Sequence, residues 1–537
     1  MNGLVQDCPL LLSSVLEHGA RNFARVPIIG RYPGESIHYD YAGAHVRARR
    51  LASSLNRLGI GLGDFLGSLA WNTHRHLELL YAATGIGAVL HTANPRLPPE
   101  HIAYTVNFTG YRTLFVDAET IGLAEQLAPR LESVDRTVLM VPRDRMPETT
   151  LTNVLSYEDL IEDGDDAFAW PRFDERLASI LCFTSGTTGA PKGVLYSHRG
   201  TVLSALSAGS GNGWALSADD TMIAIAGFFH CNGWGVPFFG PMFGAKLVLP
   251  GRRMDSEWLH RLIVEEDVTV APGVPTIWLG MLQFCRERGY GLGQLQRIFS
   301  GGTAPPAAMI EAYMRDHGIR TLHGWGMTET THAATVSVAP RDAATTDVIA
   351  AARTQGKPLY GDQIRIVDES GIPVPHDGTR SGHLEARGHW IASGYFRQPD
   401  IALESTDGWM KTGDIAVIDP DNTLHIVDRA KDVIKSGGEW ISSIALEEAA
   451  ISHPGLSEAT VIAVPDPRWQ ERPLLIAVLE EGAHVTTEEL RAYLAARVPK
   501  WWLPDTILFA DELPHGPTGK VQKDVLRGLI EDGKLTN

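Results

Sequence analysis

A run of glycine and hydroxyl side chains that ends in one lysine occupies residues 183–193, Phe-Thr-Ser-Gly-Thr-Thr-Gly-Ala-Pro-Lys-Gly. Glycines let a backbone take positive φ and approach a ligand closely, while hydroxyl groups and backbone amides can bind phosphate oxygens. Lys192 adds a positive charge. The run predicts a loop that holds the phosphates of a nucleotide through Thr184, Ser185, Gly186, Thr187, Thr188, Gly189 and Lys192.

Apolar segments on both sides of this run predict that it joins two strands. Residues 178–183 have the pattern of a buried strand, and residues 194–198 have the pattern of another. A Walker loop has a different glycine spacing and is followed by a helix, so a kinase or GTPase is disfavoured. A stretch rich in Gly, Ser and Thr can also be an ordinary surface loop. The Pro-Lys-Gly ending and the flanking strands favour phosphate binding.

A second glycine-rich segment, Gly-Trp-Gly-Met-Thr-Glu-Thr at 324–330, follows a short apolar strand predicted at 321–323. Ligands bind beside glycines at the ends of strands in doubly wound sheets, because the backbone can come close to them there. Glu329 is a hard oxygen donor of the kind that Mg²⁺ prefers. A Thr-Glu pair taken alone is more often a helix cap than a metal site.

Another carboxylate, Asp414, ends the segment Asp-Gly-Trp-Met-Lys-Thr-Gly-Asp, and Arg429 follows fifteen positions later. One carboxylate can accept hydrogen bonds from both hydroxyls of a ribose. A Gly-Asp pair by itself is usually a turn. The charge-rich segment 428–440 comes next, at a change in composition, and would ordinarily be a solvated loop. It also fits a hinge between two domains.

Taken in order, these segments resemble the signatures of the adenylate-forming superfamily, which includes acyl-CoA synthetases, luciferases and the adenylation domains of peptide synthetases. The resemblance extends over roughly residues 10–530 and is strongest to fatty acyl-CoA synthetases, with methylmercaptopropionate-CoA ligases among the similar members. It implies that a carboxylic acid, ATP and CoA give acyl-CoA, AMP and diphosphate through an acyl-adenylate. Mg²⁺ is implied as the metal.

The resemblance assigns roles that spacing alone does not. Nucleotide binding extends from the phosphate loop to Gly302, Gly324, Trp325, Gly326, Met327, Thr328, Asp414, Ile426 and Arg429. Thr184 and Glu329 are implied as metal ligands, and Gly437 and Gly438 leave room for the pantetheine arm of CoA. The acyl site is implied to include Trp234 as a gate, Gly301, Trp390 and Glu439.

The resemblance also implies three catalytic residues. Lys520, in Pro-His-Gly-Pro-Thr-Gly-Lys, is expected to stabilise the attack of the carboxylate on the α-phosphate. A cation ~4 Å away can offset about 4 kcal/mol of repulsion at an effective dielectric of 20. His230 is expected at the carboxylate end of the acyl site, and Lys435 near the site in the second half-reaction. Lys431 and Asp432 match the pivot between the two conformations.

The identity of the acid stays open in the sequence. A medium- or long-chain fatty acid is the first expectation, and a short sulfur-containing acid such as 3-methylmercaptopropionate is the alternative. An aromatic wall of Phe228, Phe229, Trp234, Phe239 and Trp325 would shorten the pocket. A second alternative is that the acyl group is transferred to a carrier protein. This is disfavoured because residues 228–250 and 428–443 resemble stand-alone ligases. A non-catalytic nucleotide-binding protein is disfavoured by the joint presence of the charged residues named above.

The elements that position these residues follow an α/β pattern. Alternating helical and strand periodicities predict βα units with mixed sheets up to about residue 425. The expected organisation is an adenylation domain over residues 1–428, a hinge over 429–432 and a small, mobile α+β lid over 433–537 that carries Lys520.

Composition excludes several classes of protein. The chain has 537 residues and a formal charge of −17, which disfavours nucleic acid and anionic membranes as partners. The four cysteines form no CxxC pair, so neither a zinc site nor a disulfide framework is expected. The first residues lack the basic segment and apolar core that are typical of a signal peptide, and no stretch reaches about 18 apolar residues. We expect a cytoplasmic protein without an integral membrane segment, and the resemblance is compatible with a homodimer.

Overall fold

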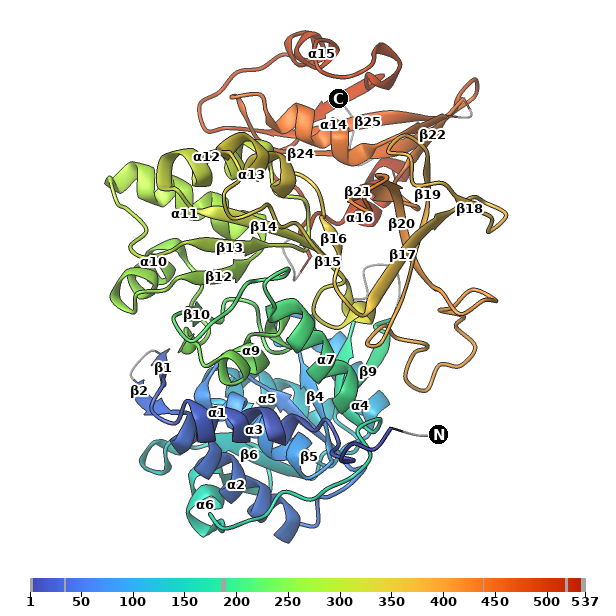
Figure 1. Ribbon diagram of the computed structural model, residues 1–537. Helices are drawn as coiled ribbons and strands as arrows, with labels where there is room; N and C mark the ends of the chain where they lie inside the picture. Colours follow the sequence, from blue (N-terminus) through green and yellow to red (C-terminus); the bar gives the residue numbers. More distant parts are fainter. Residues whose placement is uncertain (1–2, 33–34, 185–189, 438, 517–519, 533–537) are drawn as a thin grey trace.

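The computed structural model describes residues 3–32, 35–184, 190–437, 439–516 and 520–532. These residues form four sheets, with helices packed against them, and confirm the predicted α/β class with mixed sheets. In Figure 1 the chain runs from a blue lower part, through green and yellow layers, to an orange and red C-terminal part at the opposite end.

The seven-stranded sheet has the order β7-β6-β5-β3-β4-β8-β9 and is parallel except at the β9 edge. Its strands are β3 (Phe65–Leu69), β4 (Val89–Ala93), β5 (Thr113–Asp117), β6 (Arg136–Met140), β7 (Val154–Ser156), β8 (Ala178–Phe183) and β9 (Gly193–Ser197). The helices of this region are α2 (Tyr41–Arg57), α3 (His74–Gly85), α4 (Pro99–Thr109), α5 (Ile121–Leu127) and α6 (Tyr157–Asp163), with the short turns η1 (Ala118–Thr120), η2 (Ala128–Arg130) and η3 (Arg143–Arg145).

The nine-stranded sheet has the order β16-β15-β14-β13-β12-β10-β11-β1-β2. Its strands are β1 (Pro27–Tyr32), β2 (Glu35–Asp40), β10 (Thr221–Ile223), β11 (Lys246–Leu249), β12 (Val270–Gly273), β13 (Arg297–Ser300), β14 (Arg320–Trp325), β15 (Thr335–Val336) and β16 (Lys357–Pro358). The accompanying helices are α1 (Leu12–Asn22), α7 (His198–Gly209), α8 (Cys231–Trp234), α9 (Val236–Phe243), α10 (Ser256–Glu265), α11 (Pro275–Arg288), α12 (Ala307–His317), η4 (Thr328–Thr330) and α13 (Thr345–Ala352).

Two smaller sheets complete the fold. The first contains β17 (Asp362–Val367), β18 (Pro373–Val374), β19 (Ser381–Gly388), β20 (Met410–Ile418) and β21 (Leu424–Arg429). The second contains β22 (Ile434–Ser436), β23 (Glu439–Ile441), β24 (Leu456–Asp466), β25 (Gln470–Leu479) and β26 (Thr506–Phe509). It is accompanied by α14 (Ser443–Ile451), α15 (Thr487–Ala495), η5 (Lys500–Trp502) and α16 (Lys523–Glu531).

Burial explains why the strands read as continuous apolar runs. Every residue of β4 and β5 is buried, as expected for parallel strands covered on both faces. One hydrophobic core joins the two large sheets and extends in sequence from Leu12 to Trp390. A separate core, with Ile434 and Leu490 among its members, lies within the C-terminal part. The two large sheets are thus one packed unit, and the C-terminal residues have a core of their own.

The elements predicted around the motifs are present, with small shifts at their ends. The strands expected on both sides of the phosphate loop are β8 and β9, which pair antiparallel. The α+β unit expected over residues 433–537 contains α14, β24, β25, α15 and α16. In the part of the chain that the structure describes, no helix combines the length and the apolar character needed to cross a bilayer.

Candidate active site

The phosphate loop is closed at its base by backbone and side-chain hydrogen bonds between its two ends. The Thr184 amide donates to the Lys192 carbonyl at 2.9 Å, and the Lys192 amide donates to Oγ1 of Thr184 at 3.1 Å. The ammonium of Lys192 lies 5.0 Å from the ring centroid of Tyr395, a cation–π distance. The positions predicted at Ser185, Gly186, Thr187, Thr188 and Gly189 lie outside the described residues.

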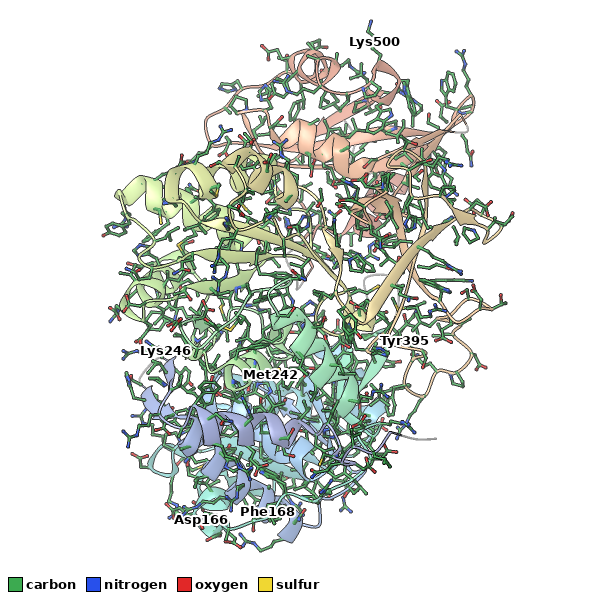
Figure 2. The ribbon with its side chains drawn as sticks, in the orientation of Figure 1. Asp166, Phe168, Met242, Lys246, Tyr395 and Lys500 are labelled. Carbon is green, nitrogen blue, oxygen red and sulfur yellow. The ribbon has the colours of Figure 1, made fainter. Side chains whose placement is uncertain are left out.

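Tyr395 also connects the loop to the candidate metal ligand. Its hydroxyl donates to Oε1 of Glu329 at 2.6 Å, and the Glu329 side chain is buried in η4. Burial, with the nearby Glu329 carboxylate, raises the pKa of Tyr395, so the phenol stays a donor. Figure 2 shows Tyr395 between the two ends of the molecule, marked by Lys500 and Asp166. Spacing gave no signal for Tyr395, and the sequence analysis missed it.

Asp414 and Arg429 face each other across two paired strands. They are register partners in β20 and β21, and Nε of Arg429 lies 3.0 Å from Oδ1 of Asp414. Nε1 of Trp325, at the end of β14, donates to Oδ2 of the same carboxylate at 2.8 Å. Burial raises the pKa of Asp414, and this increase is partly offset by Arg429, Trp325 and Lys520, which lower the pKa. The carboxylate is therefore held between an indole and a guanidinium.

Lys520 reaches this group from the far end of the chain. Its loop is closed by a hydrogen bond from the Gly516 amide to the Lys520 carbonyl at 2.7 Å. Burial and the nearby Arg429 guanidinium lower the pKa of Lys520 to about 8, while Asp414 and Cys231 act in the opposite direction. His230 also lies near Lys520. Burial and the charges of Lys520 and Arg96 lower the pKa of its imidazole to about 4. His230, Asp414, Arg429 and Lys520 thus converge.

The backbone after His230 is strained. Residues 231–235 all have positive φ, from 39° at Cys231 to 87° at Gly235, and Trp234 has φ 53°. Such conformations cost free energy in residues other than glycine and gather at functional sites. The strain directs Trp234 onto the glycines after β13. Its Cη2 lies 3.7 Å from where a Cβ on Gly301 would stand, and its Cζ2 lies 4.0 Å from the corresponding position on Gly302.

Two family models match the chain, in regions that include Lys192, His230, Glu329 and Lys520. The model of the AMP-binding enzyme matches residues 16–396, and the model of the AMP-binding enzyme C-terminal domain matches residues 445–520. The chain belongs to the AMP-binding enzyme family. The resemblance inferred from the motifs is therefore confirmed, and Lys520 is the last residue of the second match.

Individual relatives cover the chain from end to end. A 3-methylmercaptopropionyl-CoA ligase of Ruegeria lacuscaerulensis is 43% identical, covering 99% of both chains. A medium-chain-fatty-acid–CoA ligase of Ectopseudomonas oleovorans is 41% identical, covering 99% of this chain and 98% of the relative. Among solved structures, the anthranilate CoA ligase AuaEII with anthranoyl-AMP has a TM-score of 0.87 at 24% identity, covering 98% and 99% of the two chains. This last likeness supports the fold.

The predicted hinge is held by ion pairs to the last helix. Nζ of Lys431 lies 2.9 Å from Oδ2 of Asp524, and Nη2 of Arg527 lies 2.6 Å from Oδ1 of Asp432. Arg527 also binds Asp524 through Nη1 at 2.7 Å. Both hinge residues are therefore tied to α16, which begins three positions after Lys520.

Several predicted residues lie apart from the cluster around Lys520. Lys435 is half-exposed in β22, with its ammonium 3.8 Å from Glu369. Gly437 has φ 62°, and a Cβ there would stand 2.8 Å from the Trp469 ring. Gly438 and the side chain of Glu439 lie outside the described residues. The site roles of Lys435 and Gly437 stay predictions for the second half-reaction.

The remaining predicted residues make packing contacts or hydrogen bonds with other parts of the fold. Trp390 is buried, and its ring stands 2.6 Å from where a Cβ on Gly361 would lie. The Ile426 amide donates to Oε1 of Gln355 at 2.6 Å in β21. The main chain of residues 324–328 continues from β14 into η4. Gly326 lies close to Ala333, and a Cβ added to Gly326 would stand 3.1 Å from the Ala333 Cα. The Thr328 carbonyl accepts from the hydroxyl of Tyr196 at 2.6 Å, and Met327 precedes it as the cap of η4.

The aromatic wall expected from the sequence is divided among several places. Phe228 packs against His76, and Phe229 packs edge-on against Trp71. The indole of Trp325 donates its hydrogen bond to Asp414. Of that set, Trp234 lies against the glycines after β13. Side-chain direction at these positions depends on tertiary packing, which the local sequence pattern does not reveal.

Proposed function

We propose that the protein is an AMP-forming acyl-CoA synthetase that uses MgATP, CoA and a carboxylic acid. The convergence of Lys520, His230, Asp414 and Arg429 is the observation that carries this proposal. These residues come from three separate parts of the sequence, and each has the charge or donor that an adenylation needs. Family membership and relatives described as CoA ligases support the same reaction.

In the first half-reaction, a carboxylate oxygen of the acid bonds to the α-phosphorus of ATP. The bond from that phosphorus to the oxygen bridging the α- and β-phosphates breaks, and diphosphate leaves. Lys520 stands between the two anions and offsets their repulsion, most strongly in the transition state. His230 has a pKa of about 4 and so is neutral near pH 7, where it orients the acid without adding charge.

The nucleotide is held at three places. Asp414 accepts the ribose hydroxyls, with its carboxylate fixed by Trp325 and Arg429. Lys192 binds the β- and γ-phosphates from the loop, where its partner Tyr395 positions it beside Glu329. The preorganised contacts supply orientation before the chemical step.

The donor set at Glu329 fits Mg²⁺. A buried carboxylate held by Tyr395 is a donor that suits a Mg²⁺ bound mainly by phosphates and water. We assign the Thr184 hydroxyl, at the start of the loop, as the second oxygen. Glu329 and Thr184 would hold the ion, which neutralises charge on the phosphates when bound. Lys192 and Lys520 supply the fixed protein charges on either side of the reacting phosphorus.

In the second half-reaction, the CoA sulfur bonds to the acyl carbon, the bond from that carbon to AMP oxygen breaks, and the thiol proton goes to solvent. We assign residues 1–428 to the adenylation domain, 429–432 to the hinge and 433–537 to the lid. Rotation at Lys431 and Asp432 would withdraw Lys520 and bring Lys435 with Gly437 toward the site.

A line of arginines supports a route for the anionic CoA. The charge of Arg96 helps to lower the pKa of His230. The guanidinium carbon of Arg96 lies 5.3 Å from the ring centroid of Trp71, and that of Arg252 lies 6.0 Å from the same centroid. Trp71 also lines a cavity of about 220 Å³, whose charged lining residues are Arg75, Arg145 and Arg252 together with Glu35, Asp117 and Glu119. Arg252 lies 3.9 Å from Glu119, a partner that a phosphate would have to replace. Guanidinium groups bind phosphates through paired hydrogen bonds. We assign the CoA nucleotide to this cavity.

Acid-dependent formation of AMP and acyl-CoA from ATP and CoA tests the proposal. A screen of acids with graded chain length, read out as diphosphate release and by mass spectrometry of the thioester, is expected to give at least one acid with robust turnover. Purified protein that releases no diphosphate with any acid would overturn it. Cytoplasmic location and a homodimer stay predictions, which cell fractionation and light scattering check.

A further inference from the structure

The phenyl ring of Phe299 fills the space beside the glycines of the acyl site. Phe299 is the third residue of β13, and its side chain is nearly fully buried. A Cβ on Gly324 would stand 2.4 Å from its Cζ, and a Cβ on Gly301 would stand 3.5 Å from its Cε1. Its ring centroid is 5.9 Å from that of Trp234, edge to face. An acyl chain that passes Trp234 and the glycines therefore meets this ring.

A second aromatic side chain supports Phe299 from behind. Trp214, in the segment between α7 and β10, stacks on it with centroids 4.3 Å apart and an interplanar angle of 20°. Trp214 is in turn packed edge-on against Phe239 at 5.2 Å, and both side chains are fully buried. Interiors this densely packed do not yield space without moving several groups. Phe299 is thus fixed in position.

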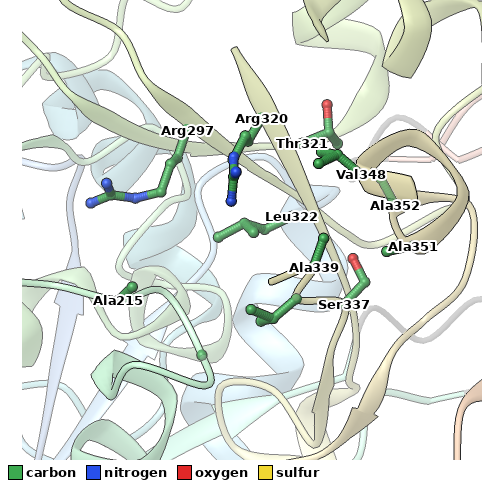
Figure 3. A pocket seen from close by; sticks show the side chains of 12 residues that line it. Ala215, Arg297, Arg320, Thr321, Leu322, Ser337, Ala339, Val348, Ala351 and Ala352 are labelled. Carbon is green, nitrogen blue, oxygen red and sulfur yellow. The ribbon is translucent and has the colours of Figure 1, made fainter. Parts of the chain in front are cut away.

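Unused space lies next to this aromatic pair. A cavity of about 70 Å³ is lined by Gly213 and Ala215, which flank Trp214 in sequence, and by Leu322. Leu322 is the register partner of Phe299 in the parallel pair β13–β14, so the two side chains stand next to each other on one face of the sheet. Figure 3 shows Leu322 in the middle of the lining residues, between Ala215 and Ser337.

We propose that Phe299 and Trp214 close the distal end of the acyl site and restrict this enzyme to short carboxylic acids. This inference rests on the proposed function and selects between the acids that the sequence left open. We expect an acid of the size of butanoate or 3-methylthiopropanoate to end before the stack and octanoate to collide with Phe299. Removing either ring would join the acyl site to the cavity beside Leu322 and admit a longer chain.

The test is the chain-length profile of kcat/KM, measured by diphosphate release with propanoate, butanoate, 3-methylthiopropanoate, hexanoate, octanoate and dodecanoate. Wild type is expected to lose about 10-fold or more per added methylene once the chain reaches Phe299. Phe299→Ala and Trp214→Ala are each expected to raise the ratio of kcat/KM for octanoate to kcat/KM for butanoate by about 100-fold. This value corresponds to relief of the penalty on at least two methylenes. Phe299→Leu keeps the core apolar and is expected to shift the optimum by a smaller step.

Trp278→Ala is the matched control. Trp278 is as buried as Trp214 but packs against Tyr313 in a different core, so its loss would lower stability without changing the chain-length ratio. Wild-type turnover of octanoate or dodecanoate as efficient as that of butanoate would overturn the inference and leave the proposed function intact. Folded Phe299→Leu protein with an unchanged profile would overturn it as well. Absence of turnover with every acid would overturn both.

Discussion

Nε1 of Trp325 donates a hydrogen bond to Oδ2 of Asp414 at 2.8 Å across 89 positions of sequence. This contact links the end of β14, in the nine-stranded sheet, to β20 in the sheet of β17–β21. Arg429 lies 3.0 Å from the other oxygen, so both carboxylate oxygens are held by side chains of this chain. Residues separated by long stretches of chain thus meet at the carboxylate that we assign to the nucleotide site.

Trp325→Phe removes this hydrogen bond and keeps an aromatic side chain. A hydrogen bond to a charged group contributes about 1.5–3 kcal/mol, so the Kd for ATP is expected to rise about 10- to 100-fold. Equilibrium titration with ATP measures it. Trp278→Phe, which loses a comparable bond to the Gly273 carbonyl outside the site, serves as control. Equal ATP affinity in wild type and Trp325→Phe would contradict the role given to Trp325.

Tyr395→Phe removes the hydroxyl that binds Glu329 while keeping a ring under Lys192. The freed carboxylate is expected to lose its fixed position, so half-saturation by Mg²⁺ should require about 10-fold more metal. Titration of diphosphate release with Mg²⁺ at saturating ATP gives the value. Tyr493→Phe, on the surface of the C-terminal part, should leave the metal dependence unchanged. A Mg²⁺ curve identical to wild type in Tyr395→Phe would exclude this positioning role.

The pKa of Lys520 predicts that adenylation slows at basic pH. Its pKa is lowered to about 8, and only the cation stabilises the attack, so kcat/KM is expected to fall as pH rises through about 8. The limit in kcat should lie higher, because bound phosphates stabilise the cation. Lys520→Arg keeps the charge at all these pH values and should move the limit upward. His230 has a pKa of about 4 and should cause no limit between pH 5 and 8.

Arg527→Gln tests the ion pair that joins Asp432 of the proposed hinge to α16, and it also removes the contact within α16 that holds Asp524, the partner of Lys431. Loss of the contacts to Asp432 and Asp524 is expected to slow the first half-reaction about two- to fivefold, because partly exposed ion pairs contribute at most about 1 kcal/mol each. Thioester formation from preformed adenylate should be unchanged or faster, since it uses the rotated lid. Single-turnover measurements separate the two steps. Equal slowing of both would point to a general loss of structure.

Arg252→Ala tests the route assigned to CoA. The KM for CoA is expected to rise about 10-fold through loss of a charge-assisted contact, with the KM for ATP unchanged. Arg261→Ala removes another exposed arginine, on α10, and should affect neither value. A normal KM for CoA in Arg252→Ala would move the nucleotide of CoA away from this cavity.

The sequence predicted the elements around the motifs well because local patterns determine them. The strands on both sides of residues 184–192 follow from their apolar runs, and the family resemblance named Asp414, Arg429 and Lys520 in advance. The contacts of Trp214, Phe299 and Tyr395 were not foreseen. Each depends on which way a side chain points within a packed core, and each involves a partner far away in sequence.

Direct detection of acyl-adenylate decides whether Lys520 carries the first step. Wild type and Lys520→Ala are incubated with ATP, Mg²⁺ and a turned-over acid without CoA, and acyl-AMP is quantified by mass spectrometry. We expect wild type to form adenylate rapidly and Lys520→Ala to be at least about 100-fold slower, with its affinity for ATP little changed. Adenylate formation at the wild-type rate in folded Lys520→Ala protein would contradict the mechanism.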